Sequence, residues 1–157
     1  MRQSFLELFL QREVAVADAD FFADEQTLTL NRRKKRFTLI EANRTLPLVR
    51  KIVTDLMSVH ARARELHGRL EKRISREDRY TVEAELDSVV QRLEHYVDEL
   101  AEVGCEIKDY QLGLVDYVCK HDGRDVYLCW RMGEETITHW HEIDAGFAAR
   151  KPVTSLK

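Results

Sequence analysis

A regular spacing of apolar residues in the middle of the chain constrains the fold most. Successive apolar positions lie alternately four and three residues apart: Val82, Leu86, Val89, Leu93, Tyr96, Leu100 and Val103. Such spacing puts one apolar stripe along a helix. Ser75 precedes the pattern as an N-cap, Glu77 and Asp78 supply acid to the first turn, and Gly104 follows as a helix-ending residue. One long helix is therefore predicted here.

A second helical pattern begins at Thr38. Thr38 and Glu41 match a capping box, in which each side chain accepts a hydrogen bond from the other residue's backbone amide. The following apolar positions are Ala42, Leu46, Val49, Val53, Leu56, Ala63 and Leu70. His60 and His67 lie at positions where the repeat would place apolar residues. We interpret them as residues of the seam between the two helices or of an interface. Pro47 is expected to kink the helix or to mark a broken first turn.

Charge predicts that the two helices pair with each other. Residues 38–76 contain nine Lys or Arg and four Asp or Glu, whereas residues 77–103 contain nine acidic residues and two Arg. A basic helix and an acidic helix attract each other, and the short connection predicts an antiparallel, coiled-coil-like hairpin. Two helices bury only one seam, so we expect the C-terminal sheet, a second copy of the chain, or both to cover it. We predict that the partner is a second copy of the chain, which makes the protein a homodimer.

The apolar pattern changes to strict alternation after the second helix. Asp122-Gly123 separates residues 114–121 from residues 124–132 and is the preferred pair of a type I′ turn. A two-residue turn fixes the register between these strands. On the side predicted to face the helices it pairs Cys119 with Val126, Tyr117 with Leu128 and Val115 with Trp130. On the other side it pairs Asp116 with Cys129.

A third strand is expected over residues 137–142. If a two-residue loop precedes it, then Ile137, His139 and His141 join the side that faces the helices, and one residue more or less in the loop reverses this assignment. The predicted fold class is α+β. A long antiparallel helical hairpin is followed by a small three-stranded antiparallel β-meander, with residues 37–157 as one domain behind an extension of residues 1–36.

Two histidines of the third strand are candidate metal ligands. His139 and His141 would lie on one side of the strand, about 6.5–7 Å apart. With a carboxylate from Glu134, Glu142 or Asp116 they would suit iron, manganese or zinc. The alternative is a pair of partly buried, hydrogen-bonded histidines. The pattern does not decide whether a metal or another cofactor binds.

Asp116 is the more informative polar residue, because it lies between apolar neighbours in GLVDYV. A carboxylate in such surroundings needs a partner, which Arg131 or Arg150 could provide. The alternative is general-base catalysis, and Cys129 is a candidate nucleophile if a histidine lies within reach. The sequence contains no phosphate-binding loop, dinucleotide fingerprint, GxSxG or HExxH motif.

Several classes of function are disfavoured by composition. The net charge of -3 does not suit a polyanion-binding protein. The basic run of residues 32–36 has no interleaved aromatic residues, so we interpret it as a solvated linker and do not expect nucleic acid as a partner. Three cysteines without a CxxC pair indicate reduced thiols and a cytoplasmic location. No run of about 18 apolar residues occurs, so we expect no membrane span.

The C-terminal half resembles a known family. The stretches KDYQLGLVDYV, DGRDVYLCWRMGE and THWHEIDAGFAARKPV, after a helix opening FTLIEANRTLPLVR, resemble a bacterial family of unknown function, domain of unknown function twenty-two zero three. The resemblance covers residues 37–153 approximately. Residues 1–36 lie outside it, either as a mobile extension or as an artefact of a start codon chosen too far upstream.

The resemblance implies a set of family-like positions but no activity. These positions are Asp109, Gly113, Asp116, Trp130, Glu134, Trp140, His141, Gly146 and Arg150. Relatives are commonly aromatic or variable where His139 stands, which favours a polar cluster of Asp116, Glu134, His141 and Arg150 over a paired-histidine site.

Two functions follow from the sequence. The first is a non-enzymatic interaction or scaffold protein that binds itself or another protein through the helical hairpin. The alternative is a module that binds a small ligand or a metal ion, and that could be an enzyme, through the polar cluster on the C-terminal sheet. We expect no membrane partner for either.

Overall fold

The computed structural model describes residues 35–156. Of the extension predicted for residues 1–36, only Lys35 and Arg36 belong to this part, so the apolar N-terminal stretch and most of the basic run lie outside the described residues. The Arg36 guanidinium contacts the Asp125 carboxylate through Nε at 2.8 Å and through Nη2 at 3.0 Å. This arginine of the basic run is thus engaged by strand β3 (Arg124–Arg131).

Two long helices open the described region. Helix α2 spans Leu39–Leu70 and helix α3 spans Arg76–Val103. The capping box of Thr38 and Glu41 is present with both of its hydrogen bonds. Pro47 lies inside α2, so the prediction of a broken first turn there is wrong. The cap bonds satisfy first-turn amides, which allows the helix to begin well before the proline.

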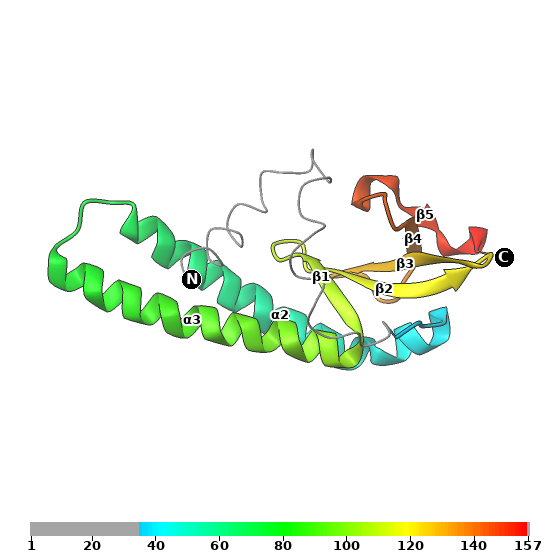
Figure 1. Cartoon of the computed structure of the whole chain (residues 1–157), viewed down its shortest axis with the longest axis horizontal. Helices are drawn as coiled ribbons and strands as arrows, with labels where there is room; N and C mark the ends of the chain where they lie inside the picture. The colour runs from blue at the N-terminus through cyan, green and yellow to red at the C-terminus, as the bar shows by residue number, and fades with distance from the viewer. Residues whose placement is uncertain (1–34, 157) are drawn as a thin grey trace. The chain divides into compact units, whose positions relative to one another are not determined.

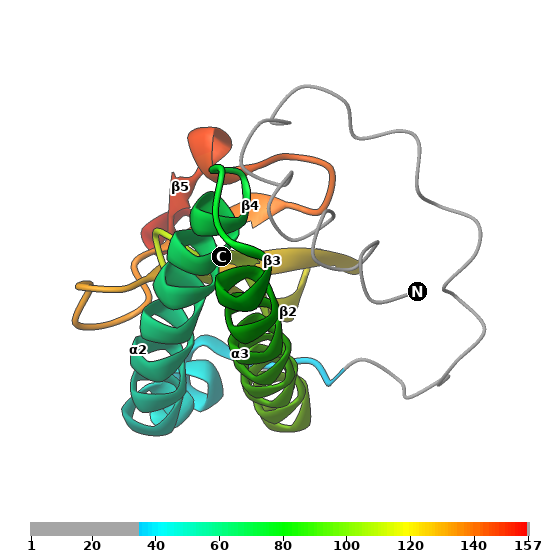
Figure 2. The same cartoon turned by 90° about the vertical axis from the view of Figure 1, so that its left-hand side faces the viewer.

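The helices lie side by side as an antiparallel hairpin, with the connecting loop far from the sheet (Figure 1, Figure 2). Arg62 of α2 donates to one carboxylate oxygen of Glu85 of α3 from Nε at 2.9 Å and from Nη2 at 2.6 Å. This pair agrees with the predicted attraction between a basic and an acidic helix. It is partly exposed, so it selects the partner helix more than it stabilises the fold.

The apolar seam is covered within a single chain. Leu86 is 5% exposed, Leu93 is 2% exposed and Leu100 is fully buried. On α2, Val49, Val53 and Leu56 are fully buried. The apolar stripes are therefore satisfied by the hairpin and the adjoining sheet, and they do not by themselves require a second copy of the chain.

The sheet has five strands rather than the predicted three. In chain order these are β1 (Cys105–Asp109), β2 (Leu114–His121), β3 (Arg124–Arg131), β4 (His139–Glu142) and β5 (Lys151–Pro152), and each pairs antiparallel with the next. β1 follows directly from the left-handed Gly104, whose φ is 107°. β5 has only two residues. A strand that short leaves no alternation in the sequence, which is why it was missed.

The register predicted for the first hairpin is confirmed. Tyr117 pairs with Leu128, and Asp116 pairs with Cys129, as the two-residue turn requires. Asp122 and Gly123 have φ angles of 48° and 79°. Two positive φ angles are the signature of a type I′ turn. Local turn chemistry thus determined this register.

The structure decides between the two placements that the sequence left open for the third strand. His141 pairs with Tyr127, so it lies on the face opposite to the helices and not on the helix-facing side. The connection before β4 is long and is fixed to α2: the Ile137 amide donates to Asn43 Oδ1 at 2.9 Å, and Arg50 Nη2 donates to the carbonyl of Glu134 at 3.2 Å. Contacts with a helix distant in sequence therefore set this register, not a tight turn.

The start of α2 packs on the helix-facing side of the sheet. The hydroxyl groups of Thr45 and Tyr117 lie 2.9 Å apart, and the rings of Phe37 and Tyr117 meet edge to face at 5.2 Å. The Arg50 guanidinium lies over the Trp130 ring at 5.8 Å. No helix of residues 35–156 combines the length and the apolar character needed to cross a membrane.

Candidate metal centre

Three ionisable side chains meet on the side of the sheet that faces away from α2. Asp116 of β2, Cys129 of β3 and His141 of β4 each place one donor atom within 4.8 Å of the other two. Asp116 is 3% exposed, Cys129 is fully buried and His141 is 3% exposed. Three adjacent strands therefore bring a carboxylate, a thiol and an imidazole together in the interior.

The imidazole of His141 is oriented by its own strand. Its Nδ1 lies 2.8 Å from the backbone carbonyl of Glu142, and its Nε2 lies 3.1 Å from Asp116 Oδ2. A carbonyl oxygen can only accept, so Nδ1 carries a hydrogen and Nε2 points to the carboxylate. In metal sites the ring nitrogen that does not bind the metal usually donates to a carbonyl or carboxylate in this way.

Opposing effects act on the pKa of His141. Burial on its own would lower this pKa, but the hydrogen bond to Asp116, the Glu142 carbonyl and the charge of Asp116 together raise it above the usual value of 6.5. Lys108 opposes them weakly. The neighbouring carboxylate therefore favours the charged form of the imidazole, and burial opposes it.

The carboxylate of Asp116 is only half satisfied. Oδ2 faces His141, while Oδ1 is buried and has no hydrogen-bond partner among the described residues. A buried oxygen without a partner costs about 1–3 kcal/mol. The prediction that an arginine neutralises Asp116 is wrong, because its partner is a histidine on the neighbouring part of the sheet.

Cys129 is a thiol and not a thiolate near neutral pH. Burial, and after it the negative charge of Asp116, raises its pKa far above the usual value. Such a thiol is a poor nucleophile, which argues against the catalytic role considered for it. A bound cation would remove this barrier, because a coordinated thiol loses its proton.

Glu134 and Arg150 form a second pair beside this cluster. Arg150 Nη2 donates to Glu134 Oε1 at 2.6 Å, and Glu134 Oε2 accepts from the Arg131 amide at 2.9 Å. The charges of Arg150 and Glu134 both act on the thiol of Cys129. The four predicted cluster residues thus form two pairs, Asp116 with His141 and Glu134 with Arg150.

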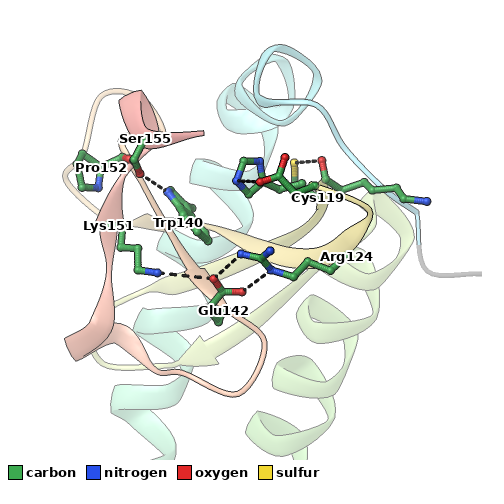
Figure 3. Close-up of polar contacts among 10 residues, drawn as sticks. Cys119, Arg124, Trp140, Glu142, Lys151, Pro152 and Ser155 are labelled. Carbon is green, nitrogen blue, oxygen red and sulfur yellow. Dashed lines mark hydrogen bonds and ion pairs between the residues drawn. The ribbon is translucent and has the colours of Figure 1, made fainter. Parts of the chain in front are cut away.

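Contacts at both ends hold β4 in position. The Glu142 carboxylate contacts Arg124 at 3.0 Å and 3.1 Å and Lys151 at 3.6 Å, and the Trp140 indole donates to the Ser155 hydroxyl at 2.9 Å (Figure 3). These contacts fix the backbone from which His141 projects. The carbonyl of Glu142 is thereby fixed against Nδ1 of the imidazole.

His139 takes another environment from that of His141. It lies on the same face, as the strand partner of Cys129, but its Nδ1 lies 2.8 Å from the Thr138 hydroxyl. Among the described residues, the group of three side chains that could hold a metal ion does not include His139. The other two carboxylates weighed for a metal are already paired, Glu134 with Arg150 and Glu142 with Arg124.

Cys129 is the member of the cluster that the sequence analysis did not assign as a ligand. The predicted register already placed it opposite Asp116. The missing information was the position of His141, because the face on which it lies depended on the unknown length of the loop before the third strand. An Asp and a Cys facing each other across two buried strands was the available signal.

Comparison with known proteins gives a family and no function. None of the curated proteins and none of the solved structures is significantly similar to this chain. The model of a family described as "Uncharacterized conserved protein (DUF2203)" matches residues 35–153. The match covers the helical hairpin and the whole sheet, and it confirms the resemblance found in the sequence. The chain therefore belongs to the DUF2203 family.

Proposed function

We propose that this protein binds a transition metal ion, with zinc as the first candidate, through Asp116, Cys129 and His141. The observation that carries the proposal is the convergence of the three donor atoms within 4.8 Å inside the protein. In a tetrahedral zinc site with ligand distances of about 2.0–2.3 Å, the donor atoms lie about 3.3–3.8 Å apart. A small contraction of the cluster would bring it to this geometry.

Charge also supports a divalent metal. A carboxylate, a thiolate and a neutral imidazole carry two negative charges in all, which balance a divalent cation in a buried site. The thiol favours a thiophilic metal over magnesium or calcium, which prefer oxygen ligands. The cation would also satisfy the unpartnered Oδ1 of Asp116.

A metal explains the cluster better than a structural ion pair does. An ion pair of Asp116 and His141, with the Cys129 thiol facing the same carboxylate, still leaves Asp116 Oδ1 without a hydrogen-bond partner among the described residues. A buried ion pair with incomplete hydrogen bonding seldom stabilises a fold more than apolar residues of similar size. A thiolate ligand needs reducing surroundings, which agrees with the cytoplasmic location that we propose.

The test is metal binding by the full chain and by matched variants. Zinc-loaded, desalted protein is expected to retain about one metal equivalent by elemental mass spectrometry, and the cobalt-loaded protein should show a thiolate-to-cobalt charge-transfer band. Cys129→Ser and His141→Gln should lose both signals. Cys119→Ser and His139→Gln are the matched controls, since they change a buried cysteine on the opposite face and the neighbouring histidine.

Two results would refute the proposal. One is a wild-type protein that retains no zinc and no cobalt. The other is a Cys129→Ser variant that binds either metal as tightly as the wild type does, because binding would then take place elsewhere. Circular dichroism of each variant separates loss of a ligand from loss of the fold.

The second candidate function is protein binding through the hairpin, and the outer face of α2 favours it. Helical steps of four, four and three residues place Ile40, Arg44, Leu48 and Lys51 on one face. Ile40 is 66% exposed and Leu48 is 54% exposed. An apolar and basic face suits an acidic helical partner. A second copy of the chain qualifies, because α3 carries nine acidic and three basic residues.

This candidate is tested by light scattering at micromolar concentration. We expect a dimer that dissociates in Leu48→Asp but not in Tyr80→Asp, which changes an exposed aromatic residue near the far end of the hairpin. A wild-type monomer would count against the homodimer. A dimer that persists in Leu48→Asp would show that the interface does not lie on this face of α2.

A further inference from the structure

Arg150 is a buried cation whose hydrogen bonding is incomplete. It follows the short helix η1 (Phe147–Ala149), and its side chain is 9% exposed. Its guanidinium lies over the Phe147 ring at 4.8 Å and donates to Glu134 from Nη2 at 2.6 Å. Its Nε is buried and has no partner among the described residues. A guanidinium can only donate, so this N–H is open to an acceptor.

The geometry of Glu134 explains why Nε is left open. An arginine and a carboxylate commonly form two parallel hydrogen bonds. Here the second carboxylate oxygen, Oε2, accepts from the backbone amide of Arg131 at 2.9 Å. Glu134 is thereby held at the turn after β3 and offers Arg150 a single oxygen. The remaining edge of the guanidinium has no acceptor from the described part of the chain.

The open N–H belongs to the surroundings of the metal centre. Side chains two residues apart on a strand point to the same face of the sheet and lie about 6–7 Å from each other. Arg131, whose amide holds Glu134, lies two residues after Cys129 on the same strand. The arginine and the three metal donors thus form one polar region on the side of the sheet that faces away from the helices.

We propose that this region binds a small carboxylate-bearing ligand, with one ligand oxygen on the metal and the other accepting a hydrogen bond from Arg150 Nε. The inference rests on the proposed metal site. Three protein donors leave one position of a tetrahedral metal free for an external ligand, which is the arrangement of catalytic zinc sites. A water molecule could fill that position or accept from Arg150. A carboxylate has two oxygens and can do both.

The experiment uses the cobalt-loaded full chain, whose visible spectrum reports the ligands of the metal. The probes are formate, the smallest carboxylate, and formamide, which has a similar shape and no charge. Formate is expected to change the cobalt spectrum saturably, and formamide is not. In Arg150→Lys, which keeps the charge beside Glu134 but lacks the directed Nε–H, formate affinity should fall about tenfold or more.

The matched control is Arg131→Lys, which changes an exposed arginine near the same Phe147 ring. It should bind formate as the wild type does. A cobalt spectrum that depends on Cys129 but does not respond to formate overturns this inference and leaves the proposed metal site standing. Equal formate affinity in Arg150→Lys and wild type overturns it as well. If no cobalt binds at all, the metal site and this inference both fail.

Discussion

Both faces of the sheet bury side chains at their centre, but the buried side chains differ in chemistry. On the helix-facing side Tyr117, Leu128 and Trp130 are fully buried. On the other side Asp116 and His141 are each 3% exposed. Burial of the apolar face stabilises the fold by about 25 cal/mol per Å². Burial of a carboxylate with one unpartnered oxygen opposes folding.

This difference indicates what each face is for. The helix-facing side provides the stability on which the remainder of the sheet depends. The polar side carries a cost that apolar residues of similar volume would avoid. Groups that are buried at such a cost are found most often where a protein binds a metal or a ligand. The polar face is therefore where function is to be sought.

The largest predicted effect is on the helix-facing side. Trp130→Ala should lower the free energy of unfolding by about 3–5 kcal/mol, because it leaves a cavity under α2 and removes the indole hydrogen bond to the Glu134 carbonyl. Urea unfolding measures the change. Trp130→Phe, which keeps most of the apolar volume, should lose less. A loss below about 1 kcal/mol in Trp130→Ala would show that this face is not the main source of stability.

The second prediction concerns the polar face. Zinc at about 1,000 times its dissociation constant should raise the free energy of unfolding by about 4 kcal/mol, which corresponds to about 8–16 °C in Tm. Differential scanning calorimetry with and without zinc measures it. Cys129→Ser should abolish the increase, and Cys119→Ser should keep it. An equal zinc effect in both variants would remove the functional contrast between the two faces.

Much of this comparison could be predicted from the sequence. The capping box at Thr38, the helix end at Gly104 and the turn at Asp122-Gly123 are local signals. They set two helices and one strand pair, and with them the position of Asp116 opposite Cys129. Local signals succeed because each needs only a few adjacent residues to specify a backbone conformation.

The position of His141 could not be predicted in this way. The side of the sheet that His141 takes depends on the path from Met132 to Thr138, which Asn43 anchors from a helix far away in the sequence. The pair of Glu134 and Arg150 likewise forms only after the chain has returned to the turn. When contacts with distant residues set the register of a strand, no periodic pattern in the sequence reveals that register.

The third prediction tests how closely α2 approaches the sheet. A Cβ on Gly113 would lie 2.8 Å from Met132 Cβ and from Met57 Sδ, and the φ of this glycine is 60°. Gly113→Ala should therefore cost about 2–4 kcal/mol from overpacking and backbone strain together. Gly123→Ala is the control, because its φ is 79° but nothing lies within 4 Å of the new Cβ. Similar losses in both variants would mean that the packing on the helix face is loose.

The smallest predicted effect is the pH dependence of stability that comes from two titratable groups of the helix-facing side. Burial raises the pKa of Cys105 from 9.0 to about 12, and burial, with the charge of Cys105 next, raises the pKa of Tyr117 above 10.0. An unfolded chain ionises both groups before the folded protein does. The free energy of unfolding should therefore be unaffected by them below about pH 9 and should fall as pH rises toward their folded pKa values.

Tyr117→Phe isolates the phenol in this response. At about pH 8 the variant should be less stable by about 1 kcal/mol, because the hydrogen bond to Thr45 is lost. Above about pH 10 it also lacks a group that titrates on unfolding, so the gap should close by about 1.4 kcal/mol per pH unit. Urea unfolding from about pH 8 to about pH 11 measures this. Tyr80→Phe, at a residue that is 76% exposed, should stay parallel to the wild type. A Tyr117→Phe curve that also stays parallel would show that water reaches the phenol, and that the helix-facing side is less dry than its burial indicates.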